Sequence, residues 1–371
     1  MAAPREGPVD AVGRMPSARA ADERSGSMAA VVISAPETGP EVHRLERPTA
    51  GAGEVLVRSH GFALCGSDLE ILSGARTEPF VRYPVVPGHE WSGTVEALGE
   101  GVTEIAPGDR VVVEGIAGCR ACRSCLAGTP ALCVRGYSEI GFTIPGGGAE
   151  FVAVPVSRVH KVPSTLTSSA AMMIEPAAVA SRALRAVGLR PGDRVAVLGA
   201  GALGLLSVAI ARAMGAGHVT AMGRSPERLE RARAFGAHAL IAAPLGTTEP
   251  AAGLDVDVVI EAGGTASAVE RAFAIASPAA RVALTGVAGT GRTLTLASDL
   301  FVLKGLTVYG IAGADHAAWR FAIDLVSEAR IPLESLITDR FPLDQSAAAY
   351  ARAASGDPSV GRVLIEHESA A

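Results

Sequence analysis

Four of the chain's five cysteines lie within fifteen consecutive residues. Four thiolates can complete a tetrahedral zinc shell that leaves no position open for a substrate, so the cluster predicts a structural metal site. Two disulfides could use the same thiols, but an otherwise cysteine-poor cytosolic chain of this size needs none. A nucleic-acid-binding zinc ribbon would carry two cysteine pairs separated by about 15 to 20 residues. The predicted zinc lobe spans residues 119–133, and its ligands are Cys119, Cys122, Cys125 and Cys133.

The fifth cysteine, Cys65, stands apart from this cluster in the segment ALCGSDLEI. His89 and Glu90 follow in VVPGHEWSG, and Glu175 lies in MMIEPAAVA. Taken singly, each has an ordinary structural explanation as a buried apolar thiol, a core histidine or an acid at the start of a helix. Their shared order along the chain, with the cysteine cluster between Glu90 and Glu175, makes them candidates for chemistry.

A glycine-rich turn indicates a nucleotide cofactor. The segment RVAVLGAGALG places Gly199, Gly201 and Gly204 directly after an apolar strand and at the start of a helical pattern. Glycine at this spacing allows a tight turn and a close approach of the backbone to a pyrophosphate, whose charge the helix N-terminus favours. The apolar run over 195–211 is therefore interpreted as strand, turn and helix, since it is also short for a membrane span.

The end of the next strand predicts which dinucleotide is bound. An NAD-preferring protein places Asp or Glu there, about twenty residues after the glycines, to hold the ribose 2′-hydroxyl. Here the strand HVTAM runs into Gly223, Arg224 and Ser225. No carboxylate would repel a 2′-phosphate, and the Arg224 guanidinium offers donors that match one. The sequence thus predicts NADP in preference to NAD; the alternative is a solvated arginine at a helix start.

Two patterns of secondary structure surround these motifs and predict an α/β chain of two domains. Short valine-rich runs punctuated by Pro and Gly, such as GEVLVRS and DRVVVEG, predict a barrel-like all-β unit over 28–178. Over 179–315, strands alternate with helical stretches of ten residues or more, which predicts a parallel sheet. Its later strands are expected at HVTAMG, DVDVVIEA, RVALTGV and LTVYGIA. Residues 316–371 return to mixed character and end in the strand-like GRVLIE.

Composition excludes several classes of partner. The chain has 33 basic and 38 acidic side chains, a formal net charge of -5 and no concentrated basic tract, so neither nucleic acid nor an anionic membrane is expected as a partner. Residues 1–27 lack hydrophobic periodicity and are expected to be disordered, or to reflect an over-long start of the reading frame. They have no apolar segment typical of a secretory signal, and their acids argue against a transit peptide, so a cytoplasmic location is expected.

The succession of Cys-Gly-Ser-Asp, Gly-His-Glu, the four-cysteine lobe and Glu-Pro resembles the zinc-dependent medium-chain dehydrogenase/reductase family, specifically its polyol (sorbitol-like) branch. The resemblance covers essentially all of 28–366. It implies a GroES-like β-barrel catalytic domain, to which residues 316–371 return, and a doubly wound Rossmann domain. The stretch YPVVPGHEWSGTV is also similar to dehydrogenases of aminocyclitol antibiotic biosynthesis, of the 2-deoxy-scyllo-inosamine type, which oxidise a ring hydroxyl of an amino-inositol.

The resemblance also implies roles for single residues. Cys65 and His89 correspond to direct ligands of a catalytic zinc, while Glu90 and Glu175 compete for the remaining protein-ligand and water-mediated places. Such mixed ligation leaves a position open for substrate, and zinc there acidifies the hydroxyl of a bound alcohol. Ser67 matches a hydroxyl that accepts the substrate proton; its alternative role is a local turn contact. Glu70 stands where many relatives carry the outer histidine of the proton relay. Ser225 and Arg228 are assigned to cofactor binding.

The expected function is an NADP-linked oxidoreductase that interconverts a secondary alcohol and a ketone, with one catalytic and one structural zinc ion per chain. The carboxylate-rich metal shell favours a polyol, sugar, cyclitol or aminocyclitol as substrate. A homo-tetramer or homo-dimer is expected from the resemblance. Two alternatives share the fold: zinc-free quinone or enoyl reductases, which lack the metal residues present here, and non-enzymatic cofactor-binding proteins of the crystallin type, which tolerate the loss of such residues.

Overall fold

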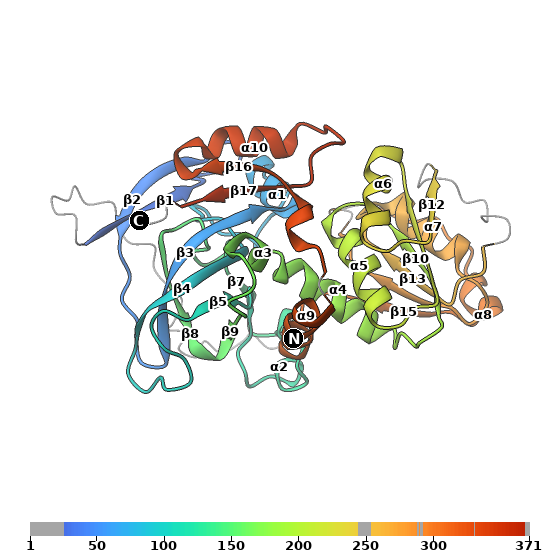
Figure 1. Cartoon of the computed structure of the whole chain (residues 1–371), viewed down its shortest axis with the longest axis horizontal. Coiled ribbons are helices and arrows are strands. Elements are labelled where there is room, and N and C mark those ends of the chain that lie inside the picture. The colour runs from blue at the N-terminus through green and yellow to red at the C-terminus, as the bar shows by residue number, and fades with distance from the viewer. Residues whose placement is uncertain (1–25, 244–253, 288, 290–291, 330, 368–371) are drawn as a thin grey trace, which may run out of the picture.

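The computed structural model describes residues 26–243, 254–287, 289, 292–329 and 331–367. Two lobes lie side by side, one rich in β-strands and one built on a parallel sheet with helices around it (Figure 1). The predicted extension over residues 1–27 lies outside the described residues, except that Gly26 is described and Ser27 opens the first strand. Within the described ranges, every helix is too short or too polar to cross a membrane.

A seven-stranded sheet forms the framework of the β-rich lobe. Its strands are β3 (Glu54–Leu64), β4 (Glu90–Leu98), β5 (Arg110–Val113), β8 (Phe151–Pro155), β9 (Val159–Lys161), β16 (Ile337–Pro342) and β17 (Arg362–Glu366). They follow the order β16-β17-β3-β4-β5-β9, and β8 also pairs with β3. In β8 the buried residues are Val152 and Val154, at the two-residue period of a strand with one face in the core.

The last strand returns to the first half of the chain. β17 pairs antiparallel with β3, and Val363 lies opposite Leu64. This register places Arg362 beside the end of β3, although 298 residues separate Arg362 from Leu64 in sequence. The late strand β17 therefore meets β3 where β3 gives way to Cys65.

Smaller elements complete the β-rich lobe. They are β1 (Ser27–Val32), β2 (Glu41–Glu46), β6 (Ile116–Ala117), β7 (Ser138–Glu139), α1 (Gly66–Ser73), α2 (Arg123–Leu126), α10 (Ser346–Ala354) and the 3-10 turns η1 (Pro130–Leu132), η2 (Val156–Arg158), η3 (Leu333–Leu336) and η4 (Leu343–Gln345). β1 pairs with β2, and β6 pairs with β7. The core that they share with the sheet has Phe62, Trp91, Phe142 and Tyr350 among its largest fully buried side chains.

The second lobe is a six-stranded parallel sheet. Its strands are β10 (Arg194–Leu198), β11 (His218–Gly223), β12 (Ala239–Ala242), β13 (Val258–Glu261), β14 (Arg281–Leu284) and β15 (Thr307–Gly310), and its helices are α5 (Ala202–Ala213), α6 (Pro226–Ala234), α7 (Ala266–Ile275) and α8 (Leu300–Lys304). The order β12-β11-β10-β13-β14-β15 reverses direction at β10, where such sheets bind ligands at the carboxyl ends of their strands. The four later strands predicted from the sequence are confirmed as β11, β13, β14 and β15. β12 was not predicted, because its ALIA run is short and no residue in it is fully buried.

Three helices join the lobes: α3 (Ser168–Met172), α4 (Ile174–Ala186) and α9 (His316–Ala329). α4 packs against both α5 and α9 (Figure 1). One continuous buried cluster extends from Ala63 of β3 and Val112 of β5, through Ile174, to Leu206 of α5 and Trp319 of α9. The structure thus confirms an α/β chain in which a β-rich unit and a parallel sheet share a core at their junction.

Candidate active site

Local backbone geometry places Cys65 and His89 at neighbouring strand ends. Cys65 lies at the junction of β3 and α1, and His89 directly precedes β4. β3 and β4 are antiparallel with Ala63 opposite Glu90, so the end of β3 meets the start of β4. Gly88 has a φ of 103°, and a Cβ there would lie 2.8 Å from the backbone nitrogen of Gly148, so this approach to His89 requires glycine.

Three of the four predicted catalytic-zinc residues come together. The ligand atoms of Cys65, His89 and Glu90 all lie within 4.8 Å of one another. Glu175, in the first turn of α4, is outside this compact group among the described residues, although its charge acts on Glu90. Burial raises the pKa of Glu175 to about 7, against the opposing influence of His89.

The chemistry of this group suits a divalent cation. Burial by itself would raise the pKa of the Cys65 thiol, but the Arg362 guanidinium and the His89 imidazole outweigh it and hold that pKa well below its usual range. The thiolate is the form of cysteine that binds metals. Glu90 Oε2 is buried and has no hydrogen-bond partner, a costly condition for a polar atom. A zinc ion held by these residues would neutralise the thiolate and satisfy Glu90 Oε2.

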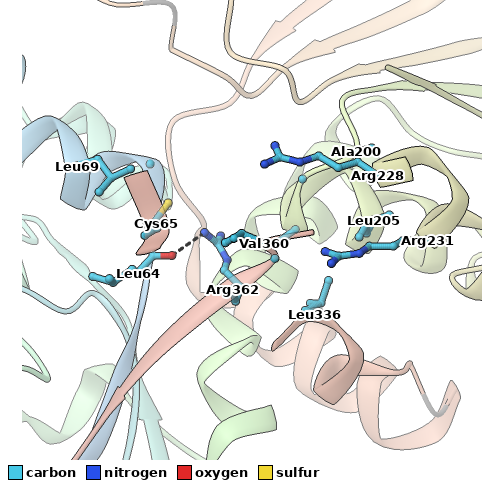
Figure 2. Close-up of a pocket in the computed structure, with 15 residues that line it drawn as sticks. Leu64, Cys65, Leu69, Ala200, Leu205, Arg228, Arg231, Leu336, Val360 and Arg362 are labelled. Carbon is cyan, nitrogen blue, oxygen red and sulfur yellow. Dashed lines mark hydrogen bonds between the residues drawn. The ribbon is translucent and has the colours of Figure 1, made fainter. Parts of the chain in front are cut away.

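Arg362 is a residue of this site that the sequence did not reveal. Its Nη2 donates to Glu90 Oε1 over 2.7 Å. Its Nη1 donates to the carbonyl of Leu64 over 3.1 Å, the bond drawn in Figure 2. Despite its burial, the anionic groups of Glu90 and Cys65 raise the pKa of Arg362 above the usual range. The Glu90 oxygen that Arg362 holds also lies 4.0 Å from His89 Nε2, while the other oxygen has no hydrogen-bond partner.

We expect Arg362→Met to destabilise the protein by about 3–5 kcal/mol, because removing one partner of a buried ion pair leaves the other charge uncompensated. Glu90 is the stranded partner, since it is only 1% exposed. The midpoint of chemical unfolding, followed by circular dichroism, measures the loss. Arg82→Met is the matched control, because the Arg82 side chain is exposed. Equal midpoints for the two variants would contradict the importance of the pair.

Asp68 orients the predicted histidine ligand. Its Oδ2 accepts the backbone N–H of Cys65 over 2.8 Å and lies 3.6 Å from His89 Nδ1. A carboxylate on the far nitrogen of a ligating histidine fixes the ring orientation and leaves the other nitrogen to the metal. Asp68 is fully buried. The sequence contained a signal for it, namely an acid three residues after the residue that caps a helix.

The two predicted proton-relay residues lie on α1 but face different partners. Ser67 Oγ is 3.5 Å from His89 Nε2, which places the hydroxyl at the metal-ligand group. Glu70 is one turn further along the helix, and its Oε2 lies 3.9 Å from Nη1 of Arg76. Burial raises the pKa of Glu70, and Arg76 opposes this. Ser67 therefore lies beside the metal-ligand group, whereas Glu70 lies beside the cation of Arg76.

The four clustered cysteines are arranged as the ligands of one ion. All four are free thiols. The sulfur of Cys122 lies 3.4 Å from that of Cys125 and 4.0 Å from that of Cys133, and the sulfurs of Cys119 and Cys125 are 3.9 Å apart. Tetrahedral zinc with sulfur ligands at about 2.3 Å would hold its sulfurs about 3.8 Å apart. A Cβ on Gly118 would collide with the Cys125 sulfur, which explains the glycine beside the cluster.

The glycine turn joins β10 to α5, as predicted. Gly199 has a φ of 111°, and a Cβ there would lie 2.7 Å from the carbonyl oxygen of Ala262. A Cβ on Gly204 would collide with the carbonyl of Gly199, so the helix can pack this closely only with glycine. Gly201 caps the N-terminus of α5 and has open space around it. That space leaves the helix N-terminus accessible to a phosphate.

The predicted cofactor-selecting residues follow β11. Arg224 is exposed, and Ser225 Oγ caps α6 by accepting the backbone N–H of Arg228 over 3.2 Å. The Arg228 side chain donates to the carbonyls of Asp357 and Pro358, over 3.1 and 3.3 Å. This contact between the lobes was not predicted, since it depends on a loop that comes 129 residues after Arg228.

One cleft connects Cys65 with the glycine turn. It is lined by Cys65 and Arg362 on one side and by Ala200, Arg228 and Arg231 on the other (Figure 2). Gly201 also belongs to its lining. Comparisons with known proteins agree with this arrangement. Residues 51–164 match the alcohol dehydrogenase GroES-like domain, and residues 202–328 match the zinc-binding dehydrogenase model.

The starvation-sensing protein RspB of Escherichia coli (strain K12) is 32% identical over 326 residues, which cover 87% of this chain and 94% of that protein. The chain belongs to the zinc-dependent alcohol dehydrogenase family. Another family member, L-threonine 3-dehydrogenase of Bacillus subtilis (strain 168), is 30% identical over 92% of this chain and 99% of its own length. The family confirms the resemblance to medium-chain dehydrogenases and the predicted pairing of a GroES-like and a Rossmann unit.

Solved structures of this family share the whole fold. A zinc-binding dehydrogenase from Sinorhizobium meliloti 1021, bound to NADP, has a TM-score of 0.84 at 29% identity, covering 92% of this chain and 100% of its own. The rspB protein of Escherichia coli CFT073, complexed with NADH, has the same TM-score at 30% identity and the same coverage. Galactitol-1-phosphate dehydrogenase from Escherichia coli has a TM-score of 0.82 at 30% identity, covering 91% and 100%.

Proposed function

We propose that this dehydrogenase uses NADP to interconvert a secondary alcohol and a ketone in a polyhydroxylated substrate. The observation that carries the proposal is the single cleft lined by both Cys65 and Gly201. A hydride can pass directly between substrate and nicotinamide only when both are held side by side, as such a cleft allows. Galactitol-1-phosphate dehydrogenase, a structural neighbour named for a polyol substrate, supports the substrate class. The relative named for L-threonine keeps an amino alcohol as an alternative.

Each candidate residue has a proposed role in this reaction or in the stability of the protein. Cys65, His89 and Glu90 would hold the catalytic zinc, with Glu175 as the further candidate, and zinc would lower the pKa of a substrate hydroxyl. Asp68 keeps His89 in position. Ser67, at the metal-ligand group, would accept the hydroxyl proton. Glu70 would pass that proton outward. The structural zinc would be held by Cys119, Cys122, Cys125 and Cys133. The pyrophosphate would be held by the turn that contains Gly199, Gly201 and Gly204.

A substrate screen tests the proposed function. Zinc-loaded protein would be given NADP and NAD side by side with polyols, sugars, inositols, amino-inositols, L-threonine and simple alcohols, and reduced nicotinamide would be followed by absorbance. We expect turnover with polyhydroxylated substrates and NADP. Turnover of L-threonine alone would overturn the substrate class, and turnover with NAD alone would overturn the cofactor preference. A protein that binds less than one zinc beyond its structural ion would favour a zinc-free reductase or a binding protein.

We expect Arg224→Asp to reverse the cofactor preference. A hydrogen bond to a charged group is worth about 1.5–3 kcal/mol, so kcat/KM for NADP should fall by about one to two orders of magnitude. The new carboxylate could also hold the ribose hydroxyls of NAD. The control is Arg233→Asp, which makes the same charge change at the other end of α6, where Arg233 pairs with Glu230. Unchanged NADP preference in Arg224→Asp would refute the assignment.

The proposal includes self-association in the cytoplasm. β15 is the edge strand of the parallel sheet, and Val308 on it is exposed. Val287, Val302 and Leu303 are each at least 80% exposed, and a second copy could cover such apolar side chains. We also propose that residues 28–178 and 316–371 form the catalytic domain and that residues 179–315 form the cofactor-binding domain. The pairing of β17 with β3 supports this division, while α9 also contacts α4 and α5.

A further inference from the structure

A third group of metal-ligating side chains lies outside both zinc sites considered above. Glu114, His160 and His316 each offer one ligand atom, and these atoms lie within 4.8 Å of one another. We propose that this group binds a divalent transition cation of the zinc class and thereby ties the start of α9 to the β-rich lobe. The set of two imidazoles and one carboxylate is one that zinc accepts in proteins.

Two of the three ligands come from neighbouring strands. β5 pairs antiparallel with β9, and Val112 lies opposite His160. Glu114 is two residues beyond Val112, so its side chain is on the same face of the sheet as that of His160. His160 Nε2 lies 2.7 Å from Glu114 Oε1, and both side chains are nearly buried, with 7% and 11% of their surfaces exposed. The end of β5 and the strand β9 thus hold two candidate ligands side by side.

The third ligand arrives from a distant part of the chain. His316 opens α9, and its Nδ1 lies 2.6 Å from the same oxygen, Oε1 of Glu114. Asp315 fixes the first turn of α9 by accepting the backbone N–H of Ala318 over 2.8 Å. One turn along α9, Trp319 stacks on the ring of His160, with 5.9 Å between ring centroids and 3° between planes. The helix is therefore held in place over the strand pair.

These distances are close to those of a bound cation. Zinc with ligands at about 2.0–2.2 Å holds its ligand atoms about 3.3 Å apart. The two histidine nitrogens now lie 2.7 and 2.6 Å from Glu114 Oε1, so they would have to move away from it by about 0.6 and 0.7 Å. His316 can make that movement, because 59% of its side chain is exposed. The same exposure gives a cation access, and three protein ligands leave a place for water.

Zinc binding to the three side chains can be counted directly. Protein first saturated with zinc and dialysed would be titrated with further zinc by calorimetry, and bound zinc would be measured by elemental mass spectrometry. We expect one more equivalent in the wild type than in His316→Gln. Glutamine retains a hydrogen-bond donor for Glu114 but lacks the imidazole. Removing a residue that only hydrogen-bonds to a metal ligand weakens metal affinity about 10–100-fold. Removing a ligand itself should therefore weaken the zinc affinity at least tenfold.

Two further variants sharpen the test. Glu114→Gln should weaken zinc binding as much as His316→Gln does. If Glu114→Gln does not fold because Glu114 is buried, His316→Gln alone tests the proposal. His43→Gln is the control, because His43 is an exposed histidine 3.3 Å from a single carboxylate, that of Glu41. Zinc should raise the thermal unfolding midpoint of the wild type and His43→Gln more than that of His316→Gln. Identical zinc uptake and identical midpoint shifts in wild type and His316→Gln would overturn the proposal.

Discussion

Replacing Cys65 by serine should lower kcat/KM by about three orders of magnitude or more. A zinc ion contributes several kcal/mol to the stabilisation of charge on a reacting oxygen, and each 1.36 kcal/mol corresponds to a factor of ten in rate. Cys65 offers the only sulfur in the group with His89 and Glu90. Serine keeps the size of the side chain but is not deprotonated at neutral pH, so the group loses its thiolate. Kinetics on the best substrate of the screen, together with zinc content, measure the effect.

The same variant should leave the fold intact, because Cys65 lies at a strand end and is only partly buried. Circular dichroism and the unfolding midpoint should remain close to those of the wild type. Zinc content should fall by one equivalent, and that equivalent should not be restored by dialysis against zinc. Near-wild-type kcat/KM in a Cys65→Ser protein that has lost zinc would contradict the assignment of Cys65 as a catalytic ligand.

Replacing Cys125 by serine should unfold the zinc lobe rather than stop the chemistry directly. Structural zinc contributes about 10–16 kcal/mol to folding in small zinc domains, and this lobe has little else to hold it. Leu126, Leu132 and Val134 are 73%, 58% and 80% exposed, and α2 has only four residues. We therefore expect loss of one zinc and rapid proteolytic cleavage within residues 119–133. Limited proteolysis followed by mass spectrometry would locate the cut.

The two serine variants serve as controls for each other. Both remove one sulfur and one zinc, but only Cys125→Ser should become sensitive to protease within the lobe, and only Cys65→Ser should lose the thiolate of the cleft. A strong chelator applied to the wild type should produce both effects. If the Cys125→Ser lobe resisted protease as the wild-type lobe does, its packing rather than zinc would account for its order.

The sequence predicted those residues whose role depends on other residues nearby in the sequence. The glycines at 199, 201 and 204 sit between a strand and a helix, so their conformational role follows from spacing alone. The four clustered cysteines were recognisable from their spacing, whereas the proposed role of Cys65 came from the resemblance to the family. Arg362 was not, because it reaches Glu90 only through the register of β17 on β3, and register depends on packing across the whole lobe.

Other contacts were hidden for the same physical reason. Glu114 meets His316 across 202 residues, and Arg228 meets the carbonyl of Asp357 across 129. No pattern in one segment fixes a partner so far away, since the partner is chosen by how helices and sheets pack. Asp68 was also not predicted, although its position three residues after Cys65 is a local signal for the contact that it makes with the helix start.

The late position of β17 also has a consequence for protein synthesis. A ribosome makes Cys65, His89 and Glu90 long before it makes Arg362, so the nascent chain carries the acidic side of a buried ion pair without its cation. The glutamate can be buried at low cost only after the strand containing Arg362 emerges and pairs with β3. Chains released before residue 362 should therefore be poorly folded at the catalytic cleft, which makes completion of translation a condition for forming an active protein.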